Sequence, residues 1–265
     1  MTRRFPGIAA SYVEDLTSGA GGAWNAGARF PAASTLKLAI AVTLVRRLRA
    51  PPAHGSYLDS SMTRMLEYSD NTAANALLAD AGGAWSVDAT MHLLGLRDTL
   101  MYGGYLVGTA ADPARIPIKT VDQPPIIGKY TTAHDLARLF ALVHLAAGGR
   151  GAISKRLHGA VSVAEARYLL YKLAHVRDPG KLDRFLPGRR IAVLHKAGWI
   201  SQARNDAGLL YWPRGVFVAA VMTWNSAGVG VSSDVLAGRT ARFTLTYLQR
   251  TTKGRPQPHG RTLRG

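Results

Sequence analysis

The alternation of apolar and polar positions predicts strands near both ends of the chain and helices between them. Strand-like runs rich in Val, Ile, Leu and aromatic residues are bounded by clusters of Gly, Ser, Pro and Asn. Two such runs come before the helical part of the chain and three come after it, joined by turns. The predicted strands are 7–13, one that starts at Ala23 after the turn-rich segment 17–22, 191–195, 208–211 and 215–223, with turns at 199–205 and 213–214.

A helix that starts near Ser34 is apolar on nearly every face from Leu36 to Val45, which predicts a central, buried helix. Arginines at its C-terminal end complement the helix dipole, and Pro51-Pro52 terminates it. The stretch from Tyr102 to Gly128 is rich in Gly and Pro, which predicts a long loop. Further helices are expected at 61–66, 72–78, 132–146, 161–176 and 234–248.

This element order predicts an α/β (α+β) fold with one antiparallel sheet made from both chain ends, flanked by helices, and an inserted all-α lobe. A groove between two such lobes is a natural place for a site. We expect residues 1–33 and 186–253 to form the α/β lobe, 34–185 the helical lobe and 254–265 a basic tail.

The composition narrows the class of protein. Hydrophobic content of 47% and charged content of 18% over 265 residues indicate a globular chain. No apolar run approaches the roughly 18 residues that span a bilayer. The chain has no cysteine, and its eight histidines show no metal-binding spacing, so we expect neither a metal nor a cofactor. The first residues carry two arginines but no signal-peptide core, so we expect a cytoplasmic protein if the chain is complete, or a secreted or envelope protein if a leader was removed.

The net charge of +17 does not by itself indicate a nucleic-acid partner. The 33 cationic residues are 25 Arg and 8 Lys scattered along the chain, and no nucleic-acid-binding motif accompanies them. We therefore expect a small-molecule or peptide substrate, and the charge predicts at most a weak attraction to anionic surfaces. The oligomeric state is left open by the sequence.

Candidate chemistry starts at Ser34-Thr35-Leu36-Lys37. Residues three apart share one face of a helix, so Lys37 can reach the hydroxyl of Ser34. A serine hydroxyl needs a base to become a good nucleophile, and lysine is a base only when neutral, which burial and a nearby cation such as Lys196 favour. Arginine cannot replace it. A chain with few lysines nevertheless has lysine at both positions.

Each of the three motifs alone is a weak signal. Ser69-Asp70-Asn71 could be the N-cap of the following helix, and Lys196-Ala197-Gly198 could be an ordinary strand end. Their order, context and flanking residues make the combined signal much stronger.

With its flanks, the set resembles the S-x-x-K, S-D-N and K-T-G motifs of class A β-lactamases and penicillin-binding proteins. Phe30 to Lys37 resembles the nucleophile segment, Tyr68 to Asn75 the second motif, and His195 to Asp206 the third motif with the next strand. The resemblance implies a two-lobed fold and serine acylation. Carried onto this chain, it implies Ser34 as nucleophile, Lys37 as base, Ser69 as proton relay, Asn71 as a contact to Lys37 and substrate, and Lys196 as a source of positive potential. It also implies substrate binding by Ala197, Gly198, Trp199 and Arg204, and an oxyanion hole from the backbone N–H groups of Ser34 and Trp199.

Three departures from the family pattern affect the expected function. The family's deacylating glutamate lies between the second motif and the segment Thr131-Thr132, and this chain has no glutamate there. Asp112 and Asp122 lie in that interval, but loop capping is the favoured interpretation for both. The second motif follows the first after only 35 residues, and Ala197 replaces a hydroxyl residue.

We therefore predict a serine-acylating hydrolase that acts through a Ser-Lys acyl-enzyme on β-lactam, peptide or ester substrates, with weak β-lactam turnover. The alternatives are a D,D-peptidase, a β-lactam or peptidoglycan sensor that acylates once, and a biosynthetic acyltransferase.

Overall fold

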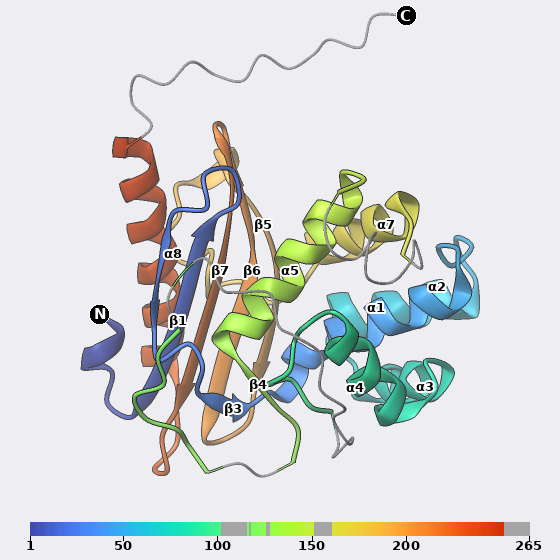
Figure 1. Cartoon of the computed structure of the whole chain (residues 1–265), viewed down its shortest axis with the longest axis horizontal. Coiled ribbons are helices and arrows are strands. Elements are labelled where there is room, and N and C mark those ends of the chain that lie inside the picture. The colour runs from blue at the N-terminus through green and yellow to red at the C-terminus, as the bar shows by residue number, and fades with distance from the viewer. Residues whose placement is uncertain (102–115, 117, 126–127, 151–160, 252–265) are drawn as a thin grey trace, which may run out of the picture.

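The computed structural model describes residues 1–101, 116, 118–125, 128–150 and 161–251 (Figure 1). Its centre is a five-stranded antiparallel sheet in the order β2-β1-β7-β6-β5. The N-terminal strands join the C-terminal ones through the β1–β7 pair, where Ser11 lies opposite Val221. The sheet is therefore built from both chain ends, as predicted. Its strands are β1 (Ile8–Asp15), β2 (Gly21–Trp24), β5 (Ala192–Trp199), β6 (Ala203–Trp212) and β7 (Gly215–Trp224).

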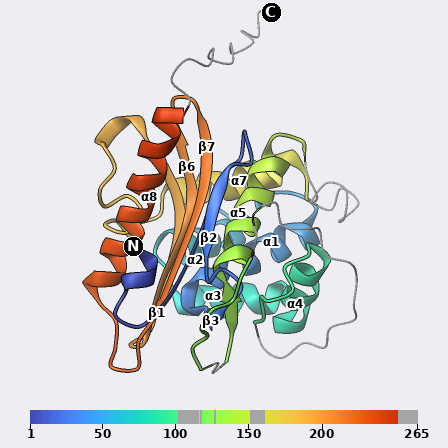
Figure 2. The same ribbon diagram turned by 60° about the vertical axis from the view of Figure 1, so that its left-hand side comes forward.

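Helices cover both faces of the sheet, α5 (Ala133–Ala147) on one and α8 (Val231–Thr251) on the other (Figure 2). The central strand β7 is consequently buried along its length except at its two ends. Its alternate side chains enter two separate cores, because successive residues of a strand point to opposite faces. Val218, Ala220 and Met222 pack with α5 and the helical lobe, whereas Phe217, Ala219 and Val221 pack with Leu236, Ala241 and Leu245 of α8.

The remaining helices form a lobe beside the sheet, with α1 at its centre (Figure 1). Every residue of α1 from Lys37 to Val45 is buried, as its continuous apolar pattern predicts. Polar side chains fix the starts of its neighbours: Ser56 caps α2, Asp70 caps α3, and Ser162 forms a capping box with Glu165 at α7. The α-helices of this lobe are α1 (Lys37–Leu48), α2 (Tyr57–Glu67), α3 (Asn71–Asp80), α4 (Gly83–Leu93) and α7 (Val163–Ala174). Two short 3-10 helices, η1 (Thr2–Arg4) and η2 (Ala33–Leu36), come before α1 in the chain, and a third, η3 (Gly188–Arg190), comes before β5.

Several predicted boundaries are wrong. The second strand does not start at Ala23, because Gly21 and Gly22 pair with Glu14 and Val13 instead of forming a turn. The turn predicted at 199–205 contains only residues 200–202, since β5 runs on to Trp199 and β6 starts at Ala203.

Two features escaped the sequence analysis. They are helix α4 and a two-stranded ladder in which β3 (Arg29–Pro31) pairs with β4 (Tyr130–Thr132). Strand β4 thus falls inside residues 34–185, which were predicted to form a lobe made only of helices. Residues 102–115, 117 and 126–127 of the predicted long loop and the predicted basic tail lie outside the described residues, and the described stretch 118–125 contains no helix or strand. No described helix has the length and hydrophobicity needed to cross a membrane.

Candidate active site

Ser34 lies in η2, a single 3-10 turn that continues directly into α1. The helical N-terminus presents free backbone N–H groups and the positive end of the dipole near its hydroxyl. The preceding residue, Ala33, has a φ of 49°, a left-handed conformation that is costly for a residue with a β-carbon. Two bonds hold this strained turn: Asn205 Nδ2 donates to Pro31 O (2.8 Å), and Ala32 N donates to Lys129 O (3.1 Å).

Lys37 starts α1 with its side chain pointing to the second motif. It is 5% exposed, and its Nζ donates to Ser69 O (2.6 Å), Asn71 Oδ1 (2.7 Å) and Ser69 Oγ (3.3 Å). Ser34 and Lys37 line the same cavity of about 360 Å³, together with Asn71, Met101, Lys129 and Trp199. Nucleophile and candidate base therefore share one ligand-accessible space.

Ser69 joins the second motif to the third. It sits between α2 and α3 with a φ of 58°, another strained left-handed residue. Its Oγ is within hydrogen-bond distance of two ammonium groups, Lys37 Nζ and Lys196 Nζ (3.0 Å). Asp70 fixes the segment, because its carboxylate caps α3 and pairs with Arg64. Ser69 is thus a strained residue at the point where the two lysines meet.

Lys196 comes from β5 and is completely buried. Its Nζ also donates to Ala197 O (3.2 Å). Burial lowers the pKa of Lys196 to about 8, although Asp178 and Asp206 oppose this. Burial also lowers the pKa of Lys37 to about 8, assisted by the nearby charges of Lys196 and Lys129. Both amines are therefore partly neutral in weakly alkaline solution.

Gly198 explains how β5 approaches Ser34 so closely. A β-carbon at this position would lie 2.6 Å from both Ser34 N and Thr35 N, so any larger residue would push the strand away. Next to it, Trp199 borders the cavity with 62% of its side chain exposed.

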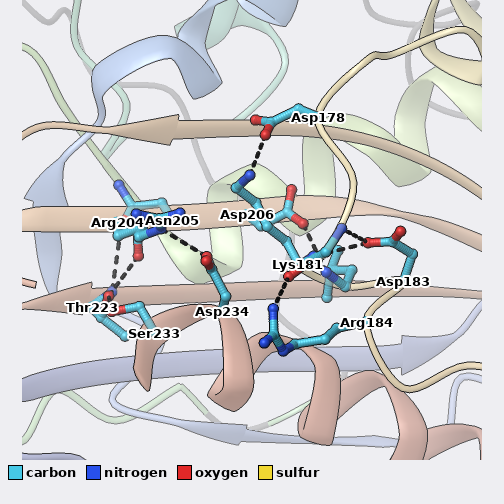
Figure 3. Close-up of polar contacts among 12 residues, drawn as sticks. Asp178, Lys181, Asp183, Arg184, Arg204, Asn205, Asp206, Thr223, Ser233 and Asp234 are labelled. Atoms are coloured by element: carbon cyan, nitrogen blue, oxygen red, sulfur yellow. Dashed lines mark hydrogen bonds and ion pairs between the residues drawn. The ribbon is translucent and has the colours of Figure 1, made fainter. Parts of the chain in front are cut away.

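Three predicted substrate-binding residues, Ala197, Gly198 and Arg204, are not among the residues that line the cavity. Ala197 is 2% exposed and buried in the sheet. Arg204 Nε donates to Asp234 Oδ1 at 2.7 Å (Figure 3). The Arg204 guanidinium lies 6.0 Å from the ring centroid of Trp199. The arginine is thus held by a carboxylate of α8.

His195, the neighbour of Lys196 in β5, forms a buried pair with Asp206 of β6. His195 Nδ1 lies 2.8 Å from Asp206 Oδ1, and Leu182 N donates to Asp206 Oδ2 (3.1 Å). Burial alone would lower the pKa of His195, but the Asp206 carboxylate outweighs it and raises that pKa. Because successive residues of a strand point to opposite faces, His195 lies on the other face of β5 from Lys196, where this partner satisfies its ring.

Two residues that shape the site were not predicted from the sequence. Asn205 was noted only as part of the third-motif flank, yet its amide anchors Pro31. Lys129 was not considered, although it stands shortly before the Thr131-Thr132 segment that the family resemblance had already located. Among the described residues no three His, Asp or Glu side chains cluster in a way that could hold a metal ion.

A protein-family model described as "Beta-lactamase enzyme family" matches residues 52–243, a span that includes the second and third motifs. The chain belongs to the β-lactamase enzyme family. This confirms the predicted family, and membership implies an enzyme of the serine hydrolase type that acts on small molecules.

Solved structures confirm the fold of this β-lactamase-family chain. A β-lactamase from Sphaerobacter thermophilus is 22% identical, with a TM-score of 0.69 over 95% of this chain and 94% of that one. A structure of PBP-A is also 22% identical, with a TM-score of 0.71 over 94% and 93%. A β-lactamase from Streptosporangium roseum is 19% identical, with a TM-score of 0.70 over 94% and 95%. The comparison with curated proteins gives no match.

Proposed function

We propose that this protein is a serine-acylating hydrolase that forms an ester between Ser34 Oγ and the acyl group of a β-lactam, ester or peptide. One observation carries the proposal. Ser34 and Lys37 line one cavity of about 360 Å³, and behind Lys37 the hydroxyl of Ser69 is shared with Lys196, the second buried lysine of lowered pKa. Such a set supplies a nucleophile, a base at the right protonation state and a proton relay.

In the proposed acylation, neutral Lys37 takes the proton of Ser34 Oγ as that oxygen attacks the carbonyl carbon. The backbone N–H groups of Ser34 and Trp199 donate to the developing oxyanion. Ser69 then donates its proton to the leaving nitrogen or oxygen and is reprotonated from a lysine ammonium, for which its position beside Lys37 and Lys196 is suitable. Asn71 holds the Lys37 amine and contacts the substrate.

Hydrolysis of the acyl-enzyme is proposed to be slow for β-lactams. The chain has no glutamate between Asn71 and Thr131, so the usual carboxylate that activates the deacylating water is missing. Acyl groups derived from peptides and activated esters can be hydrolysed from Ser34 faster, because the leaving groups of these substrates vacate the cavity and leave room for water.

Penicillin binding with little turnover is the second candidate. The missing glutamate favours it, and so does the likeness to PBP-A, a mutant of which has been solved as an acyl-enzyme complex with penicillin G. Steady turnover of nitrocefin or a nitrophenyl ester would exclude this candidate in favour of a hydrolase.

The deciding experiment labels the protein with a fluorescent penicillin and follows the label by gel and intact mass. We expect a stoichiometric adduct on the native protein, no adduct on Ser34→Ala, and slow loss during a chase with unlabelled penicillin. An unlabelled native protein would contradict acylation, and rapid turnover without an adduct would contradict slow hydrolysis.

A further inference from the structure

Lys129 lines the active-site cavity from the wall opposite β5. Its backbone precedes β4, and its carbonyl accepts from Ala32 N, two residues before Ser34. Strand β3 lies between β4 and the central sheet, because Pro31 pairs with Tyr130 on one side and accepts from Asn205 on the other. Ser34 is therefore flanked by Gly198 of β5 on one side and by Lys129 on the other.

The Lys129 ammonium has no counter-charge in the described part of the chain. It is half-buried, and no described residue forms an ion pair or hydrogen bond with its Nζ. The described residues that line the cavity include two lysines, Lys37 and Lys129, and none is an Asp or Glu. A half-buried cation facing a cavity without a carboxylate is a suitable receptor for an anionic ligand group.

On the β5 side, Lys196 is completely buried, contacts Ser69 Oγ and Ala197 O, and is not among the residues that line the cavity. The third motif has Ala197 in place of a hydroxyl residue, and its methyl group is buried. Arg204, the cation that the family resemblance assigns to substrate binding, is paired with Asp234. Lys129, on the side of Ser34 away from β5, is therefore the cation available to bind an anionic group of the substrate.

We propose that Lys129 forms a subsite for a carboxylate carried by the acyl part of the substrate. This inference rests on the proposed function, because that function defines which part of the substrate remains on Ser34. The leaving group departs toward Ser69 and Lys196, whereas Lys129 lies on the far side of Ser34 from β5. A negative group near Lys129 therefore belongs to the acyl portion, and the preferred substrates are acyl donors with an acidic side chain.

Benzylpenicillin and carbenicillin test the subsite, because they differ only by one carboxylate on the acyl side chain. The measurement is the second-order acylation rate constant of each compound, and the quantity compared is their ratio. Changing Lys129 also alters the pKa of Lys37, but this affects both compounds and cancels in the ratio.

In Lys129→Gln we expect the carbenicillin to benzylpenicillin ratio to fall by about tenfold, and in Lys129→Arg to stay near the native value. Lys119→Gln is the matched control, since it removes one exposed lysine charge outside the cavity wall and should leave the ratio unchanged. High salt should reduce the native preference, because it screens a half-buried charge pair.

An unchanged ratio in Lys129→Gln, or an equal fall in Lys119→Gln, would overturn the subsite while acylation stands. If neither compound acylates the native protein, the proposed function fails. Equilibrium binding of the two penicillins to Ser34→Ala, with and without Lys129→Gln, then tests the subsite by itself: a carbenicillin preference that needs Lys129 supports it, and equal binding refutes it.

Discussion

Four buried lysines of this protein fall into two pairs with different surroundings. Lys172 and Lys181 each contact a carboxylate, Asp59 and Asp178 respectively. Among the residues that the structure describes, Lys37 and Lys196 contact hydroxyl, amide and carbonyl oxygens and no carboxylate. All four are at most 5% exposed, so burial does not distinguish them. The partner of a buried lysine therefore determines whether that lysine serves as a structural cation or as an available amine.

The Lys172 cluster shows what a satisfied buried cation looks like. Its Nζ lies 2.7 Å from Asp59 Oδ1 and donates to Thr63 Oγ1, and Tyr168 OH donates to the same carboxylate. Burial would raise the pKa of Asp59, but these bonds and one from Gly55 N lower it to about 2. The pair links α2 to α7, and the Asp59 carboxylate stays ionised over the ordinary pH range.

The largest expected effect comes from exchanging lysine for arginine in each pair. Lys37→Arg should slow penicillin acylation by about 10²–10⁴-fold, because a guanidinium keeps its proton and cannot accept that of Ser34. Lys172→Arg, which keeps the ion pair with Asp59, should acylate within about twofold of the native rate. Stopped-flow acylation with a chromogenic cephalosporin measures both. Native-like acylation by Lys37→Arg would show that Lys37 is not the base.

Breaking the structural pair should affect stability and leave the chemistry intact. Asp59→Asn leaves the Lys172 charge buried without a counter-charge, which should cost about 3–5 kcal/mol of unfolding free energy in urea titrations. Adding Lys172→Met removes the remaining charge and should restore a large part of that loss. The folded fraction should still be labelled by penicillin at the native rate. A cost below about 1 kcal/mol would mean that the pair is not a structural element.

This contrast between lysines could be predicted only in part from the sequence. Local sequence pattern predicts the spacing of Ser34 and Lys37, the order of strands and helices, and the buried central helix. The structure has this order of elements and this helix. The partner of each lysine does not follow, since Lys172 and Asp59 lie on two helices that are far apart in the chain. The expectation that Arg204 binds substrate came from the family resemblance, and nothing local in the sequence places Asp234 beside it.

Elements without a local signal were missed or misplaced as well. Strands β3 and β4 have three residues each and exist through a pairing of distant segments, which brings Lys129 to Ser34. Gly21 and Gly22 were predicted to be turn residues, yet the first is needed because a β-carbon there would lie 2.0 Å from Val13 O. Glycine can indicate close packing of strands as well as a turn.

The pH profile of acylation provides a further way to distinguish Lys37 from Lys172. Because Lys37 must be neutral and its pKa is lowered to about 8, the rate should rise roughly tenfold per pH unit from about pH 6 to 7 and level off above about pH 8. Lys129→Gln should move the midpoint upward, since the Lys129 charge helps to lower the pKa of Lys37. Lys172→Arg should leave the profile in place. A flat native profile between about pH 6 and 8 would contradict a lysine base.

The smallest expected effect is a pH-dependent difference in stability. Lys37 has a lowered pKa in the folded protein and an ordinary pKa near 10.5 when unfolded, so the unfolded chain binds more protons between about pH 8 and 10.5. Stability from this group must therefore increase as the pH rises through that window, and below it the ionised amine burdens the folded state. Lys37→Met removes the burden, so its stability relative to the native protein should be greater at about pH 7 than at about pH 10, by on the order of 2 kcal/mol in urea titrations. Lys172→Met instead leaves Asp59 unpaired and should be destabilising at both pH values. If the stability difference between Lys37→Met and the native protein were equal at the two pH values, the pKa of Lys37 would not be lowered in the folded protein. Burial would then not explain how Lys37 could act as a base.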